Sequence, residues 1–110
     1  MMNGLEGKNV SNICGDSKGN LVCSIDELGV FRWSSNDNKW IYIKDSESVF
    51  NKDAFSSLKY FKNSFYFSTN DNIYMINTSD WIVKQITKNL VIQGVSDIEV
   101  YDDIIYFSMA

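Results

Sequence analysis

The chain has 110 residues, a formal net charge of −4, 45% apolar residues, and neither histidine nor proline. This length suits one small domain, and the apolar content argues against disorder. Only one arginine, Arg32, is present, and the lysines are scattered among carboxylates, so the basic surface of a nucleic-acid-binding protein is not expected.

Aromatic and β-branched residues dominate the apolar set, as in pleated, half-buried strands. After a polar lead-in at residues 1–9, short apolar runs alternate with clusters of Gly, Asn, Asp and Ser that are typical of turns. The predicted strands are residues 10–14, 21–25, 30–33, 39–44, 55–61, 64–69, 73–76, 81–87, 95–101 and 104–109. The longest connection, 45–53, contains serines that can cap one helical turn.

An internal repeat organises these strands. The stretch 19–40 returns in degenerate form as 63–81, and its first half starts again as 103–109. Ser24 and Ser68 are 44 residues apart, and Ser68 and Ser108 are 40 apart. A period in this range with four strands per unit is the signature of a β-propeller blade. A four-stranded sheet has two apolar faces, and radial stacking on the next blade buries them.

We therefore predict an all-β fold, a partial β-propeller of four-stranded antiparallel blades repeated every 40–44 residues. The lead-in is 1–9, the first blade 10–54, the second 55–94, and the first half of a third 95–110. Propellers have typically about four to eight blades. The first interpretation is that this is a fragment of a longer propeller, and the second is that several chains assemble. Strand 104–109 is then an apolar edge unless another segment covers it.

The cysteines flank the first predicted hairpin. A turn at 16–19 would place Cys14 opposite Leu21 and Cys23 opposite Asn12, so the thiols would be diagonal neighbours. A disulfide requires Cα atoms within about 7 Å and suitable Cβ directions. We expect two free thiols that serve as small apolar residues. With two cysteines, no CxxC and no histidine, no metal site and no cofactor are predicted.

One family pattern resembles the chain. The residues that carry the resemblance are Gly4-Leu5, Val10, Ile13, Asp16, Gly19-Asn20-Leu21, Leu28-Gly29-Val30-Phe31-Arg32 and Trp40. Their order is similar to the two-component regulator propeller repeat, in detail over residues 4–40. The sequence departs from the family at Val22, where the repeat has tryptophan, although Tyr66 and Tyr106 restore an aromatic residue in the later units.

The resemblance implies a multi-bladed sensory or binding domain, often outside the cell and joined to signalling modules. The compartment stays open at this stage. The start of the chain does not resemble a signal peptide, so a complete protein would be cytoplasmic, whereas part of a sensor would be extracytoplasmic. No apolar stretch approaches the roughly 18 residues of a membrane-spanning helix, so no membrane segment is expected.

In a propeller, the turns between second and third strands share one face with the connections between blades. The candidate ligand or partner residues on this face are Asp26, Glu27, Asn70 and Asp71, to which we add Arg32 as the one arginine. Calcium would need about six to eight converging oxygen ligands, and no calcium-loop spacing is present.

We predict a non-catalytic ligand- or protein-binding module, sensory or scaffolding, and no enzyme activity, because no histidine is available to activate a nucleophile. One alternative is a carbohydrate-binding, lectin-like propeller in which Trp33 stacks on sugars. Another is the non-catalytic part of a propeller hydrolase or lyase. Trp40 and Trp81 lie 41 residues apart, and we expect both to start outer strands and pack on neighbouring blades.

Overall fold

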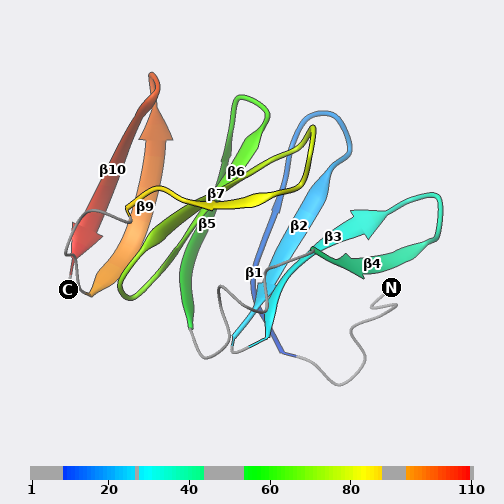
Figure 1. The fold of residues 1–110 in the computed structure, drawn as a ribbon, viewed down its shortest axis with the longest axis horizontal. Helices are drawn as coiled ribbons and strands as arrows, with labels where there is room; N and C mark the ends of the chain where they lie inside the picture. The colour runs from blue at the N-terminus through cyan, green and yellow to red at the C-terminus, as the bar shows by residue number, and fades with distance from the viewer. Residues whose placement is uncertain (1–8, 27, 44–53, 88–93, 110) are drawn as a thin grey trace.

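The computed structural model of the chain describes residues 9–26, 28–43, 54–87 and 94–109. In these ranges the protein is all-β and forms three antiparallel sheets without a helix (Figure 1). The first sheet contains β1 (Val10–Gly15), β2 (Leu21–Ile25), β3 (Gly29–Ser34) and β4 (Lys39–Tyr42). The second contains β5 (Phe55–Phe61), β6 (Ser64–Thr69), β7 (Ile73–Asn77) and β8 (Val83–Gln85). The third contains β9 (Val95–Tyr101) and β10 (Ile104–Met109).

Strand order follows chain order in both four-stranded sheets. The prediction of an all-β fold with four-stranded antiparallel sheets is confirmed, and the bounds of β2, β5, β6, β9 and β10 are those predicted. The domain boundaries predicted between the sheets stay predictions. The helical turn considered for 45–53 lies outside the described residues.

The last strand of the second sheet is shorter than predicted. Instead of 81–87, β8 is limited to Val83–Gln85. Trp81 has a positive φ of 57° and donates its backbone N–H to the carbonyl of Asn77 at 2.8 Å, so it belongs to the turn. Val83 lies opposite Ile76, whereas Trp40 lies opposite Trp33. The two tryptophans are therefore not equivalent, and the prediction that Trp81 starts a strand is wrong.

The β1–β2 register also differs by one residue from the prediction. Cys14 pairs with Val22, and Cys23 pairs with Ile13. Since neighbouring side chains on a strand point to opposite faces, the thiols lie on opposite sides of the sheet. Both cysteines are free, as predicted.

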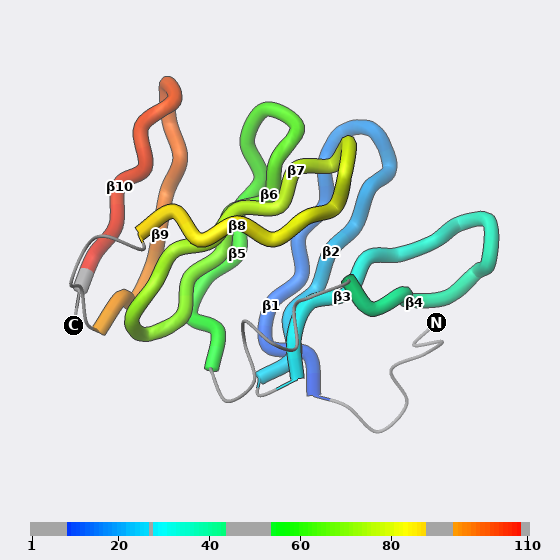
Figure 2. The backbone as a smooth tube through the Cα atoms, in the orientation of Figure 1, coloured from blue at the N-terminus to red at the C-terminus, as the bar shows by residue number. Residues whose placement is uncertain are grey.

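The hairpins that open the three sheets, β1–β2, β5–β6 and β9–β10, have two kinds of turn. The β5–β6 and β9–β10 turns have two central residues with positive φ: Lys62 (45°) and Asn63 (65°), and Asp102 (52°) and Asp103 (64°). Two such residues define the type I′ turn that matches the twist of paired strands. Figure 2 shows the three hairpin turns on the same side of the molecule, as expected from a repeated unit.

The β1–β2 turn is longer and is organised by Asp16. One carboxylate oxygen accepts the backbone N–H groups of Lys18 and Asn20, each at 2.8 Å, and the other accepts the Asn20 amide at 2.7 Å. Gly19 takes the positive φ of 90° that closes the loop. Desolvation raises the pKa of Asp16, but the hydrogen bonds from Asn20 and Lys18 outweigh it and hold the pKa below its ordinary value.

Each first strand carries a serine where the register with the second strand shifts, as at a β-bulge. The hydroxyl of this serine lies beside that of a serine on the second strand. The three pairs are Ser11–Ser24, Ser56–Ser68 and Ser96–Ser108, with Oγ–Oγ distances of 3.0, 2.7 and 2.9 Å. The first serine of each pair also donates to the carbonyl of the second, at 3.0, 3.4 and 3.3 Å. This pair recurs in every sheet.

The core lies between successive sheets. Strand β5 packs against β1 and β2, and β9 packs against β5 and β6. The cluster between the first and second sheets consists of Val22, Val30, Ile43, Phe55, Leu58, Phe65, Phe67, Tyr74 and Ile76. A smaller cluster between the second and third sheets consists of Ile73, Val95 and Ile98. A further cluster lies within the first sheet, around Cys23 and Phe31.

Candidate functional site

The predicted site residues lie in two turns and one strand. Asp26 follows β2, and Asn70 and Asp71 follow β6. Asp26 and Asn70 have corresponding places, each two residues after a buried serine, Ser24 or Ser68. Arg32 lies within β3, and Glu27 lies outside the described residues. The structure therefore places Asp26 and the Asn70–Asp71 pair in equivalent turns of different sheets, and Arg32 elsewhere.

Both turns hold the first strand of the next sheet. The Asp26 carboxylate accepts the backbone N–H of Phe55, the first residue of β5, at 2.9 Å. In the second turn, the backbone carbonyl of Asn70 accepts the N–H of Val95, the first residue of β9, at 3.0 Å. The two turns thus accept hydrogen bonds from equivalent backbone N–H groups, one through a side-chain carboxylate and the other through a backbone carbonyl. Asp26 has a structural contact that its sequence position did not reveal.

The polar side chains of the second turn are also engaged. The Asn70 amide donates to the Asp71 carboxylate at 2.8 Å. The side-chain carbonyl of the next residue, Asn72, accepts from Gln85 at 2.7 Å and from the Thr87 hydroxyl at 3.2 Å. These contacts join the turn to the segment around β8. The exposed atoms of Asn70 and Asp71 remain the part of this turn that solvent or a partner can reach.

Arg32 bridges the first and second sheets. Its guanidinium carbon lies 5.3 Å from the centroid of the Trp81 ring, a cation–π distance. On the second sheet, the Trp81 ring is stacked with Phe65, with centroids 6.4 Å apart and planes at 21°. The lone arginine therefore contacts an aromatic ring of the next sheet and does not join the acidic turns.

At the opposite edge, the first-hairpin turns contact one another. The Lys18 ammonium donates to the side-chain carbonyl of Asn63 at 3.1 Å, and Lys62 lies 3.4 Å from the Asp103 carboxylate. In both contacts a lysine of one hairpin reaches the turn of the following sheet. These side chains are exposed, and such pairs contribute little to stability individually.

The aromatic pair considered for sugar binding lies on the outer strands of the first sheet. Trp33 and Trp40 are cross-strand partners, with ring centroids 5.5 Å apart and planes at 70°. Trp40 is buried and Trp33 is half-buried. Trp40 therefore packs within its own sheet, and Trp33 keeps the exposed part that the carbohydrate prediction needs.

Catalytic chemistry has few groups to use in the described ranges. There, no three His, Cys, Asp or Glu side chains gather as a metal site would require. Burial raises the pKa of Cys23 to about 12, and desolvation also raises the pKa of Cys14. Both thiols are therefore poorer nucleophiles than an exposed cysteine, because the reactive species is the thiolate. Across the described segments, no helix is long and apolar enough to cross a membrane.

Sequence reasoning identified the second serine of each pair but missed the first. The signal was present, because an apolar residue, a serine, a variable residue and an aliphatic residue occur in succession in each first strand. These runs are 10–13, 55–58 and 95–98. The contact between Arg32 and Trp81 had no comparable signal, since it joins residues from different sheets.

No protein-family model and no curated protein matches the chain. Two crystal structures of the extracellular domain of BT4673 from B. thetaiotaomicron are similar to it, one named as a hybrid two component system and the other as a one component system. The TM-scores are 0.73 and 0.66, at 21% and 20% sequence identity. Each match covers 96% of this chain and 14% of the other. At this identity the likeness shows a shared fold, and the chain spans only a small part of that domain.

Proposed function

We propose that the chain is a segment of a β-propeller that serves as a non-catalytic sensory or ligand-binding module outside the cytoplasm. The observation that carries the proposal is the repetition of one junction between sheets. At each junction, a turn after the second strand captures the first backbone N–H of the next sheet, at Phe55 and again at Val95.

The packing at the two junctions supports the same architecture. Leu58 and Ile98 stand two residues after the bulged serine of their strands, and both are buried against the preceding sheet, at 7% and 1% exposure. When each four-stranded sheet packs on the preceding one in the same orientation, successive sheets can be arranged around a common axis, as in a propeller.

The sensory part of the proposal is supported by the structural likeness to BT4673. Its domain is named as extracellular and as part of a two component system. Because this chain matches 14% of that domain, it corresponds to a portion of a larger sensory unit. Since Asp26 and Arg32 contact the neighbouring sheet, we infer that ligands are bound by exposed turn atoms such as those of Asn70 and Asp71.

An experimental structure tests the architecture. The rotation that superposes the first sheet on the second should be similar to the one that superposes β5–β6 on β9–β10, and the two axes should coincide. Axes that diverge would contradict a propeller, because closure requires a common axis.

A ligand screen that follows thermal unfolding tests the function. A ligand that binds only the folded state stabilises it by RT ln(1 + [L]/Kd), about 2.7 kcal/mol at a concentration of 100 Kd, and mass spectrometry should recover that ligand unchanged. Loss of oligosaccharide binding in Trp33→Ala would favour the lectin alternative. Chemical turnover of a ligand would contradict the non-catalytic proposal.

A further inference from the structure

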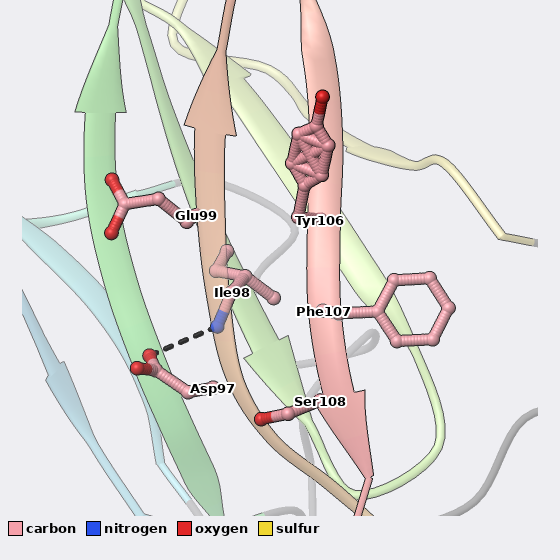
Figure 3. A pocket seen from close by; sticks show the side chains of 6 residues that line it. All are labelled: Asp97, Ile98, Glu99, Tyr106, Phe107 and Ser108. Atoms are coloured by element: carbon pink, nitrogen blue, oxygen red, sulfur yellow. Dashed lines mark hydrogen bonds between the residues drawn. The ribbon is translucent and has the colours of Figure 1, made fainter.

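Charged side chains between the second and third sheets already have partners. Figure 3 shows the carboxylates of Asp97 and Glu99 at an open pocket of about 300 Å³ on the third sheet. The Ser57 hydroxyl donates to the Asp97 carboxylate at 2.8 Å, and the Glu99 carboxylate lies 3.8 Å from the Lys59 ammonium. The two charges that line this pocket are therefore engaged with β5.

Arg32, the single arginine of the chain, differs from these residues. It is half-buried in β3, and none of the hydrogen bonds or ion pairs within the described ranges involves its guanidinium. Its contact is with the Trp81 ring, whose centroid lies 5.3 Å from the guanidinium carbon. A guanidinium has five N–H donors in a planar fork, and one aromatic ring does not satisfy them all. Arg32 thus keeps donors for a further acceptor.

The repeated unit does not require an arginine at this position. Arg32 lies opposite Val22, and Met75 lies opposite Tyr66. Val22 and Tyr66 have equivalent places in the repeat, each two residues before the buried serine of its strand. Arg32 and Met75 are therefore equivalent residues of the first and second sheets. The second sheet forms with an uncharged side chain there, so the guanidinium is a feature of the first sheet alone among the two.

Trp81 occupies a backbone conformation that suits a smaller residue better. Its φ is 57°, and the equivalent residue of the first sheet, Asn38, has a φ of 53°. The two stand two residues before Val83 and Trp40, which have equivalent places in the outer strands. Asparagine tolerates the left-handed region, whereas a bulky residue is uncommon in it. Such strain persists where surrounding contacts hold it, often at functional sites, which points to a role for the indole.

The contacts of Trp81 fix the position of the arginine. Phe65 is fully buried, and its ring stacks with the indole at 6.4 Å between centroids and 21° between planes. The indole in turn contacts Arg32 of the first sheet, and Figure 1 shows the turn between β7 and β8 beside that sheet. A rigid core residue therefore holds the ring, and the ring holds the guanidinium. Both sides of this contact belong to the described residues.

We propose that Arg32 binds the carboxylate or phosphate group of a ligand at the junction between the first and second sheets, with Trp81 as the residue that positions it. The planar fork of a guanidinium matches both oxyanions through two parallel N–H···O bonds. Because the chain has a net charge of −4, an anion is attracted only where a cation keeps free donors. A guanidinium that an aromatic ring already holds loses little freedom when the anion binds.

This inference goes beyond the proposed function and does not rest on it. The ligand atoms inferred above belong to the turn of Asn70 and Asp71, which follows β6, whereas Phe65 and its stacked tryptophan lie near the start of that strand. Failure of the experiment below would leave the sensory function and its ligand screen unaffected.

Nuclear magnetic resonance of the ¹⁵N-labelled full chain tests the proposal directly. One arginine gives one side-chain Nε–H signal, and the indole signal of Trp81 is the one of three that Trp81→Leu removes. Inorganic phosphate and acetate are added separately at an ionic strength kept constant with sodium chloride. The Arg32 and Trp81 signals should shift together and saturate with one dissociation constant, whereas the other two indole signals should not follow. The anion that binds more tightly identifies the class of oxyanion.

Two variants separate the guanidinium fork from its charge. Arg32→Lys keeps the charge but loses the fork, and the affinity read from the Trp81 signal should fall at least about tenfold, as for the loss of one charged hydrogen bond. Lys62→Met is the matched control, because it removes a positive charge from an exposed side chain of another junction and should leave the affinity unchanged. Circular dichroism should show both variants folded.

Trp81→Leu tests the positioning role. The Arg32 Nε–H signal remains as a reporter, and the affinity should fall by about two- to fivefold, in line with the strength of one cation–π contact. Shifts that never saturate, or that sodium chloride alone reproduces, would overturn the proposal. Wild-type affinity in Arg32→Lys, or an equal loss in Lys62→Met, would also overturn it, because the anion would then respond to charge and not to the fork.

Discussion

The two junctions between sheets share a backbone arrangement but differ in their side chains. Among the described residues, nine buried side chains form an aromatic-rich cluster between the first and second sheets. Between the second and third sheets, the described part of the buried cluster has three residues, and polar contacts surround it. These are the Ser57–Asp97 hydrogen bond, the Lys59–Glu99 pair at 3.8 Å and the Lys62–Asp103 pair at 3.4 Å.

The difference shows which features specify the stacking. Both junctions keep the serine pair, the aliphatic residue two positions after the bulge, and the captured N–H of the next strand. Beyond these shared features, the first junction adds buried aromatic and aliphatic residues, whereas the second adds hydrogen-bonded and charged pairs. A few hydrogen bonds to backbone groups and one buried aliphatic residue are thus common to both junctions. The apolar area that each junction buries sets how much it contributes to the free energy of unfolding.

The largest expected effect concerns equivalent phenylalanines. Phe67 is fully buried and contacts Phe55 and Tyr74, with centroids 6.0 and 5.8 Å away, whereas Phe107 is 39% exposed. Phe67→Ala should lower the free energy of unfolding by about 3–5 kcal/mol. Phe107→Ala should lower it by less than about 2 kcal/mol, because less area leaves water on folding. Urea denaturation measures both, and equal losses would contradict the difference between the junctions.

A smaller effect is expected at the captured N–H groups. Asp26→Ala removes the carboxylate that accepts from Phe55 and should cost about 1–2 kcal/mol of unfolding free energy. Asn70→Ala is the matched control, because the backbone carbonyl that accepts from Val95 stays in place. If Asn70→Ala costs as much as Asp26→Ala, the side-chain acceptor has no special role.

The cation–π contact at the first junction should contribute less. A double-mutant cycle with Arg32→Met and Trp81→Leu should give a coupling energy of about 0.5–1 kcal/mol in denaturant unfolding. Arg32→Lys should retain part of it, because the charge remains. Additive single losses would show that the 5.3 Å approach does not stabilise the junction.

The smallest effect is a pH dependence in the first hairpin. The folded pKa of Asp16 lies below its unfolded value of about 3.8, so its contribution to stability is present above that value and is lost as the pH falls through the folded pKa. In Asp16→Asn, the free energy of unfolding should therefore fall less steeply with decreasing pH in the acidic range than in the wild type. Ser17→Ala in the same turn is the control, and an unchanged acid limb in Asp16→Asn would contradict the assignment.

Much of the fold could be predicted because its signals are local. Alternating apolar residues and turn clusters located the ten strands of the described residues, and residues that tolerate positive φ marked the hairpins. The errors occurred where local signals were ambiguous. A one-residue change in the β1–β2 turn shifted the register of Cys14, and a tryptophan at positive φ resembled the start of a strand.

The candidate site was less predictable, because its residues act across sheets. Asp26 and Arg32 were selected as a carboxylate and a lone guanidinium that the repeat did not explain. The structure gives Asp26 the N–H of Phe55 and Arg32 the ring of Trp81. Both partners belong to the next sheet, and no spacing within one unit identifies them.

The sequence by itself determined the strands, their order and the repeat, because pleating and turn formation depend on residues close together in the chain. Only the tertiary structure decided which face of each sheet is covered, since burial depends on what stacks against it. Ile13 and Ile98 stand in the same place after a bulged serine, yet one is 59% exposed and the other 1%. The second sheet covers Ile98, whereas none of the described strands packs over Ile13.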